Sequence, residues 1–194
     1  MESTMTRRRD GKSFSQAGFS LIEVMIAGAI MMIGLLAVLG LFGTALAATQ
    51  ASQLDEIAHA RATQTLESIY TARQTSQFGF AAIDNTTAAS GKGQFTAGMV
   101  ALTDPGPDGL DGTSDDVAAA PIVLPGPDGK LGTSDDITVS LASFQRQITI
   151  TNAINPLSGA QDPNLKQIIA TIQYPGANGK WRTYSVQTLI SAFH

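Results

Sequence analysis

The sequence has no cysteine, only two histidines and few charged residues. Without cysteine it has no disulfide framework, no thiolate metal site and no cysteine nucleophile. Two histidines also give little basis for a histidine-based catalytic or metal site. The 16 acidic residues outnumber the 12 basic ones, and phosphate binding requires clustered cations, so nucleic acid is not expected as the main partner. Packing, assembly or a bound ion must therefore stabilise the chain.

The motifs of common enzyme classes are missing as well. The sequence has no G-x-S-x-G, no P-loop and no H-E-x-x-H. A hydrolase could use the acidic pairs at residues 115–116 and 135–136. The two members of each pair are adjacent in sequence, however, and acid–base catalysis needs carboxylates that converge on one substrate. We therefore expect no enzymatic activity.

Charge is also missing from a long stretch near the N-terminus. Residues 24–54 contain no charged side chain, and residues 24–48 alone exceed the roughly 20 that cross a bilayer as a helix. Basic residues precede the stretch and acidic residues follow it, which predicts a single-pass protein with its N-terminus in the cytoplasm and its C-terminus outside. A cleaved secretory signal, with Ala45-Leu46-Ala47 as its cleavage site, and a plain signal anchor are alternatives. A cleaved secretory signal would have a shorter apolar core. A plain signal anchor does not explain Glu23, since a carboxylate within a span costs on the order of 2.5–3.5 kcal/mol.

The segment GFSLIEVMIA (residues 18–27) follows a short basic leader. It resembles the cleavage and methylation motif of type IV prepilins and type II secretion pseudopilins. The resemblance implies that a prepilin peptidase cuts between Gly18 and Phe19 and methylates the new terminus. It also implies that the Glu23 carboxylate meets the freed amine of Phe19, in its own chain or in a neighbouring subunit. The alternative is that Glu23 only extends to the membrane interface.

The sequence after the span predicts an α+β fold, with one long helix and then an antiparallel sheet. Apolar residues at spacings of three and four predict that the helix continues and packs against a globular head: Leu54, Ile57, Ala58, Ala62, Leu66, Ile69 and Tyr70. The charged residues around them are expected on or near the solvated side: Asp55, Glu56, His59, Arg61, Glu67 and Arg73. β-Rich runs at residues 144–151, 165–174 and 181–191 predict the sheet. This order resembles the pilin fold, and the last 50 or so residues look most like PilV-type minor pilins.

These patterns divide the chain into five segments. We expect a cleaved leader (1–18), a transmembrane and filament-core helix (19–48), the amphipathic half of that helix (49–74), a variable loop region (75–141) and the β-sheet (142–194).

The loop region holds one internal repeat. PGPDGLDGTSDD (residues 105–116) recurs as PGPDGKLGTSDD (residues 125–136), and its glycines and prolines predict turns. Oxygen-rich loops without nitrogen ligands suit a hard cation, above all calcium. The candidate calcium ligands are Asp104, Asp108, Asp111, Asp115, Asp116, Asp128, Asp135 and Asp136. The first copy matches an EF-hand loop only in part and the second lacks its first ligand, so we do not predict an EF-hand. The alternative is that both copies are acidic surface turns.

Together these features predict a structural subunit, a minor pilin that initiates, caps or decorates a type IV pilus-like filament. Its expected partners are prepilin peptidase, other pilins or minor pilins through the N-terminal helix, and the inner membrane before assembly into a periplasmic or extracellular filament. The alternatives are a type II secretion pseudopilin and a membrane-anchored, calcium-dependent adhesive module.

Overall fold

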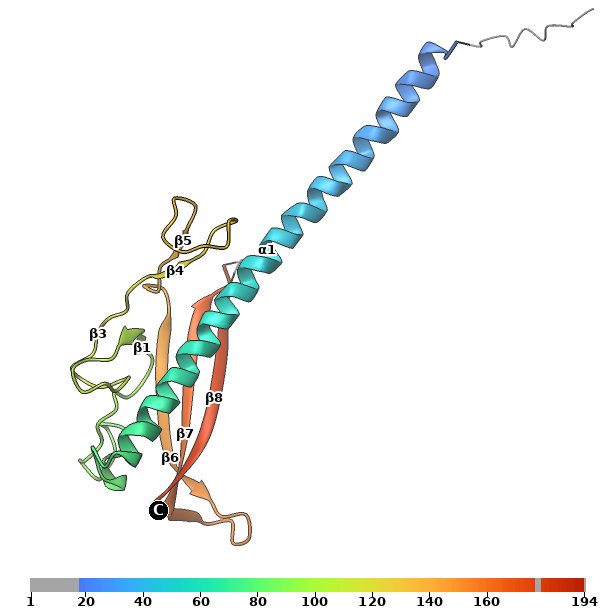
Figure 1. The fold of residues 1–194 in the computed structure, drawn as a ribbon. Helices are drawn as coiled ribbons and strands as arrows, with labels where there is room; N and C mark the ends of the chain where they lie inside the picture. The colour runs from blue at the N-terminus through green and yellow to red at the C-terminus, as the bar shows by residue number, and fades with distance from the viewer. Residues whose placement is uncertain (1–17, 177–178, 194) are drawn as a thin grey trace, which may run out of the picture. The chain divides into compact units, whose positions relative to one another are not determined.

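The structure is a computed structural model that describes residues 18–176 and 179–193 (Figure 1). The chain forms two compact units, residues 1–46 and residues 47–194. Helix α1 (Leu21–Gln74) contributes its first part to the N-terminal unit and its remainder to the C-terminal unit. Most of the predicted leader, residues 1–17, lies outside the described residues.

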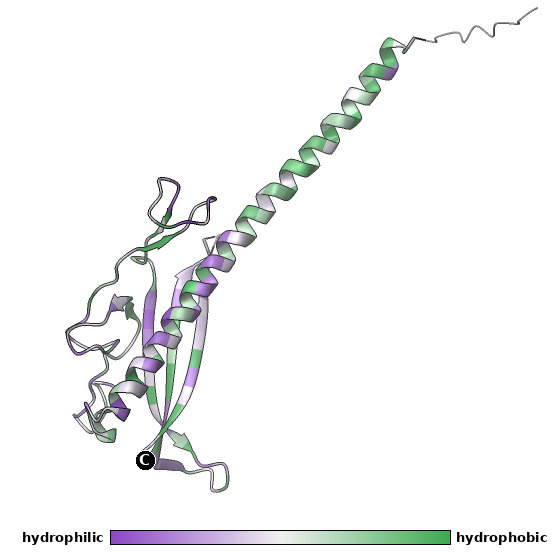
Figure 2. Ribbon diagram, viewed as in Figure 1, coloured by the Kyte–Doolittle hydropathy of each residue, from purple (hydrophilic) through white to green (hydrophobic). Residues whose placement is uncertain are grey.

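The described part of the N-terminal unit is almost entirely apolar helix. Figure 2 shows this portion of α1 as mainly hydrophobic along its length, and its side chains are exposed. By length and composition, α1 is long and apolar enough to cross a membrane. A cylinder that is apolar on every side requires lipid or other apolar helices around it.

The C-terminal unit packs the second part of α1 on an antiparallel sheet, which confirms the predicted α+β fold (Figure 1). The sheet has the order β1-β6-β7-β8, and its strands are β1 (Val100–Ala101), β6 (Gln145–Ile154), β7 (Gln161–Pro175) and β8 (Trp181–Ser191). The arrangement is consistent with a pilin-like fold. The region predicted as loops contributes the short edge strand β1, because Val100 pairs with Arg146.

Two smaller strand pairs lie in the loop region, with one turn of 3-10 helix, η1 (Phe80–Ala82), before them. Strand β2 (Thr103–Asp104) pairs with β3 (Val117–Ala118), and β4 (Ile122–Leu124) pairs with β5 (Ile137–Val139). The first copy of the repeat connects β2 to β3, and the second connects β4 to β5. Each copy is therefore the loop of its own hairpin.

The core lies between α1 and the inner face of the sheet. Side chains alternate across a strand, and every second residue of β7 from Lys166 to Tyr174 is buried. One cluster joins Ile57, Ala58 and Ala62 of α1 to Phe144, Ile172 and Tyr174, among others. A second cluster contains Ile69, Ile83, Phe95, Ile148, Ile150, Ile168 and Ile190.

The predicted apolar stripe of α1 is correct except at its end. Tyr70 is 50% exposed, whereas Thr65 and Ala72 are buried. Successive residues are turned by about 100° around a helix, so Tyr70 lies to one side of the stripe through Thr65, Ile69 and Ala72. Arg61 also departs from the expected solvated side, because its guanidinium forms an ion pair with Asp104 at 2.8 Å and its side chain is only 16% exposed.

Candidate functional site

The N-terminal motif lies where α1 begins. Gly18, Phe19 and Ser20 precede the helix, and Glu23 is in its first turn. The backbone N–H of Glu23 donates to the Ser20 hydroxyl at 3.3 Å and to the Ser20 carbonyl at 3.1 Å. Ser20 is therefore the helix N-cap, and Ser20-Leu21-Ile22-Glu23 has the S-x-x-E sequence of a capping box. Four consecutive residues carry this signal, which the predictions above did not include.

This position gives Glu23 a role within its own helix. A carboxylate in the first turn is favoured by the positive end of the helix dipole. Phe19, just before this turn, is 81% exposed.

The two copies of the repeat adopt the same turn. The backbone N–H of Asp108 donates to Asp115 and that of Asp128 to Asp135, at 3.3 and 3.2 Å. The turn also needs glycine, because Gly112 and Gly132 have φ angles of +88° and +86°, which are strained for other residues. The aspartates therefore serve first as acceptors that fix the turn.

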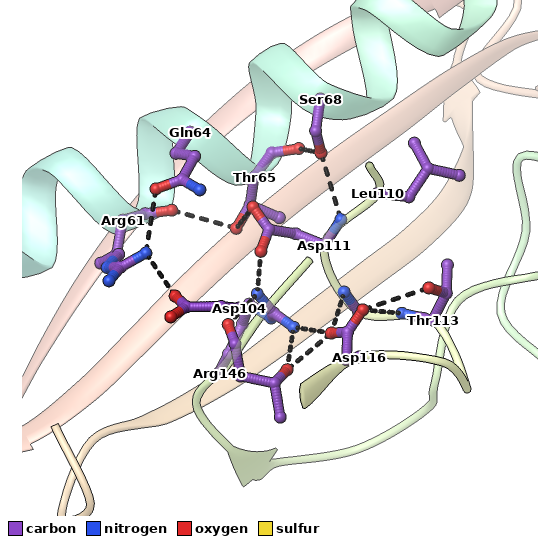
Figure 3. Close-up of polar contacts among 12 residues, drawn as sticks. Arg61, Gln64, Thr65, Ser68, Asp104, Leu110, Asp111, Thr113, Asp116 and Arg146 are labelled. Atoms are coloured by element: carbon purple, nitrogen blue, oxygen red, sulfur yellow. Dashed lines mark hydrogen bonds and ion pairs between the residues drawn. The ribbon is translucent and has the colours of Figure 1, made fainter. Parts of the chain in front are cut away.

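The first copy also carries a buried charge network (Figure 3). Arg146 of β6 forms ion pairs with Asp111 and Asp116, both at 2.7 Å, and its side chain is 1% exposed. Its second terminal nitrogen also donates to the Thr103 hydroxyl at 2.7 Å. A guanidinium donates in a fixed planar fork, so this set of acceptors fixes its orientation.

The network continues onto helix α1. The Arg61–Asp104 ion pair lies beside it, and Asp111 accepts from the Thr65 hydroxyl at 3.5 Å (Figure 3). The Asp111 N–H donates to the Ser68 hydroxyl at 3.4 Å. Through these contacts the first copy connects α1 to strand β6.

Burial affects the pKa of one carboxyl in this network. It raises the pKa of the Asp111 carboxyl above its ordinary value, although Arg146 opposes the shift. Two arginines and three aspartates meet here, so the network contains one more acidic than basic side chain. By contrast, hydroxyl donation from Thr113 and Thr133 lowers the pKa of the exposed Asp115 and Asp135 carboxyls.

The second copy has no such network. Among the residues that the structure describes, no cation pairs with Asp128, Asp135 or Asp136. In the first copy Asp111 and Asp116 form ion pairs, and Asp104, directly before it, forms another. Within residues 18–176 and 179–193, no group of three or more histidine, cysteine, aspartate or glutamate side chains is placed to hold a metal ion. Calcium binding by the repeats stays a prediction.

Arg146, the centre of the network, is not among the residues predicted above. Its signal is the alternation along strand β6 and the residue before it, which places Arg146 on the same side as the buried Phe144 and Ile148. A charged residue at an inward position needs an opposite charge. Lys166 of β7 obeys the same rule, because its ammonium donates to the Ile83 carbonyl at 2.6 Å and pairs with Asp84 at 3.1 Å.

One comparison with known proteins found a match. The family model for the prokaryotic N-terminal methylation motif matches residues 13–39. This match supports a type IV pilin or pseudopilin, a class of structural proteins and not of enzymes. No curated protein and no solved structure matched the chain.

Proposed function

We propose that this chain is a minor subunit of a type IV pilus-like filament. The proposal rests on one observation: the methylation motif lies at the start of a 54-residue helix whose first half is apolar and exposed on every side. The motif implies cleavage by prepilin peptidase and assembly with other pilins. Such a helix can be held first by lipid and then by the helices of neighbouring subunits.

Glu23 is proposed to set the register between subunits. After cleavage at Gly18, the amine of Phe19 and the carboxylate of Glu23 would both lie in an apolar environment, where an unpaired charge is costly. Pairing one subunit's amine with a carboxylate reduces this cost and fixes the position of the two helices. The inner membrane would hold the subunit, N-terminus in and C-terminus out, until the filament extracts it.

Processing is tested first. We expect the protein isolated from a host with an active prepilin peptidase to have the mass of the chain from Phe19 onward, plus one methyl group. Gly18→Leu should retain the leader, because a larger side chain does not fit the cleavage site that the motif implies. Intact mass spectrometry measures both. A wild-type protein that keeps residues 1–18 beside an active peptidase would contradict the proposal.

The register role is tested by two variants that separate charge from capping. Glu23→Gln keeps an acceptor in the first turn but removes the charge, and should reduce filament content while cleavage continues. Ser20→Ala removes the cap, which costs about 1 kcal/mol of helix stability, and should leave filament content near wild type. Immunoblots of sheared filaments measure both. If Ser20→Ala reduces incorporation as much as Glu23→Gln, capping and not charge explains Glu23.

A further inference from the structure

Strand β8 forms one edge of the four-stranded sheet, and β6 with the short β1 beside it forms the other (Figure 1). Other segments cover the β6 edge. The Leu102 N–H donates to the Phe144 carbonyl at 2.9 Å, and the Asn85 side chain donates to the Ile148 carbonyl at 2.8 Å and accepts from the Ile150 N–H at 3.0 Å. Among the described strands, β8 pairs only with β7, in one unbroken register.

The outward backbone groups of β8 are free. In an antiparallel pair, alternate residues direct both their N–H and C=O groups at the partner strand. The Gly176 N–H donates to the Lys180 carbonyl, and the register continues unbroken from there, so the even-numbered residues of β8 bond to β7. The backbone groups that point away from β7 belong to Thr183, Ser185, Gln187 and Leu189. Within residues 18–176 and 179–193, no hydrogen bond is made to them.

This edge lacks the features by which exposed edge strands usually avoid pairing. Charged side chains, prolines and bulges commonly block such an edge. Residues 183–191 include none of these, and Leu189 among them is 55% exposed. The β8 edge is therefore open to a further strand, whereas the β6 edge is not.

A groove lies between β8 and helix α1. One hollow in it, with a volume of about 380 Å³, is lined by Leu66, Glu67, Tyr70 and Thr71 of α1 and by Gln187 and Thr188 of β8. Tyr70 is 50% exposed, and Glu67 pairs with no cation among the described residues. A strand added to β8 would direct alternate side chains toward this groove. Apolar and basic side chains would suit it best.

We propose that β8 binds an extended strand of a partner protein as a fifth strand of the sheet. Main-chain hydrogen bonds along the free edge supply the affinity, and alternate side chains in the groove supply the specificity. The partner strand carries apolar residues and a lysine or arginine on its α1-facing side. The β8 strand of a second copy does not fit this description, because residues 183–191 contain no basic residue to face Glu67. This inference does not depend on filament assembly.

The test uses a peptide copy of part of β7, residues 165–174 (LKQIIATIQY), whose even-numbered residues place a lysine and apolar side chains on one face. With that face toward α1, the N–H groups of the odd-numbered residues point at β8. The probe is N-methylated at peptide residues 168, 170 and 172, which keeps the N–H groups that face β8 and prevents the peptide from growing into sheets. The control peptide is N-methylated at residues 167, 169 and 171 instead and should not bind.

Amide hydrogen exchange of the full-length, ¹⁵N-labelled protein in detergent micelles measures binding. Without peptide, the amides of Ser185, Gln187 and Leu189 should exchange fast, and those of Tyr184 and Val186 slowly. With the probe at roughly ten times its Kd, the three fast amides should slow about tenfold. The control peptide should leave them unchanged.

Variants assign the response to the edge of β8. Gln187→Pro removes one outward N–H, which an edge strand tolerates, and should abolish the slowing at Ser185 and Leu189. Gln187→Ala is the matched control, because it removes the same side chain and keeps the N–H. Glu67→Gln should weaken binding several-fold. The proposal is wrong if the odd-numbered amides are already slow without peptide, as they would be if a second copy covered β8, if the two peptides act alike, or if Gln187→Pro responds as Gln187→Ala does.

Discussion

The two copies of the repeat share ten of twelve residues and one turn geometry, yet they have different surroundings. In the first copy Leu110 and Asp111 are buried, and Asp111 and Asp116 hold Arg146. In the second copy the equivalent Lys130 and Leu131 are exposed. The turn is thus fixed by residues within each copy. Packing of the first copy against α1 and β6 depends instead on the two residues that differ and on the residues that face them.

The comparison also separates two uses of aspartate. Asp108, Asp115 and their equivalents Asp128 and Asp135 accept backbone N–H groups or hydroxyls of their own turn. Asp111 accepts from a distant strand and has no acidic equivalent in the second copy. We therefore expect substitutions in the first copy to cost more stability than matched substitutions in the second.

Removing Arg146 should have the largest effect. Arg146→Leu leaves Asp111 and Asp116 buried without a counter-charge, which costs about 3–5 kcal/mol of unfolding free energy. Urea denaturation of the full-length protein in detergent, followed by the fluorescence of its one tryptophan, Trp181, measures the loss. Lys130→Ala in the second copy should stay within about 0.5 kcal/mol of wild type. Equal unfolding free energies for the two variants would contradict the conclusion that Arg146 holds the first copy against the fold.

Matched substitutions of the shared carboxylate should differ next. Asp116→Asn weakens a charge-assisted contact to Arg146 and should cost about 1.5–3 kcal/mol. Asp136→Asn keeps the acceptor for Gly132 and loses no ion pair among the described residues, so a change within about 0.5 kcal/mol is expected. The same denaturation experiment compares them. A similar loss in both variants would mean that the carboxylates act only within their turns.

Substitutions of the two matched glycines separate strain within the turn from packing of the first copy against the sheet. Gly112→Ala and Gly132→Ala both place an alanine at a positive φ, a strain of about 1–2 kcal/mol in each copy. Only at Gly112 would the added methyl group meet the Ile148 side chain, which should cost about 1 kcal/mol more. Thermal melting can rank the two variants, and a larger loss for Gly132→Ala would contradict the packing of the first copy.

Calcium should have a smaller effect, shared by both copies. The turn carboxylates already accept N–H groups, so we expect a site at the weak end of calcium affinities, with a Kd of about 1 mM. Calcium at that concentration would add about 0.4 kcal/mol of stability. Magnesium should add less, because it dehydrates reluctantly. Asp108→Ala and Asp128→Ala should each reduce the response. Identical melting curves and proteolysis patterns in millimolar calcium and in EDTA would refute calcium binding.

Titration of the aspartates in the wild-type protein should show the difference between buried and exposed carboxyls without any mutation. Carboxyl ¹³C NMR should place the pKa of Asp111 above the ordinary value of 3.8 and those of Asp115 and Asp135 below it. A raised native pKa means that Asp111 lowers stability as the pH rises from 3.8 through its native pKa. The lowered values mean that Asp115 and Asp135 add stability above pH 3.8 and lose it as the pH falls through their native pKa. A pKa of Asp111 at or below that of Asp135 would contradict the burial of the first copy.

The sequence predicted the features that depend on local pattern. The apolar run and the alternation of β6, β7 and β8 predicted the α+β fold, and glycine and proline predicted the turns. It did not predict which copy packs against α1 and β6. That depends on Arg146 meeting Asp116 and Asp111, which lie 30 and 35 positions away in the sequence. The inward position of Arg146 signalled a buried partner but could not identify it. Tyr70 was predicted on the buried stripe of α1 but lies to one side of it, because successive residues of a helix are rotated by about 100°.

A pair of double-mutant cycles tests the central claim most directly, namely that the first copy stabilises the fold through Arg146 and the second copy does not. The cycles combine Arg146→Leu with Asp116→Asn and, separately, with Asp136→Asn, and compare unfolding free energies. We predict a coupling energy of about 1–3 kcal/mol between Arg146 and Asp116 and a value within about 0.5 kcal/mol of zero between Arg146 and Asp136. Equal coupling in the two cycles, or none between Arg146 and Asp116, would contradict the account.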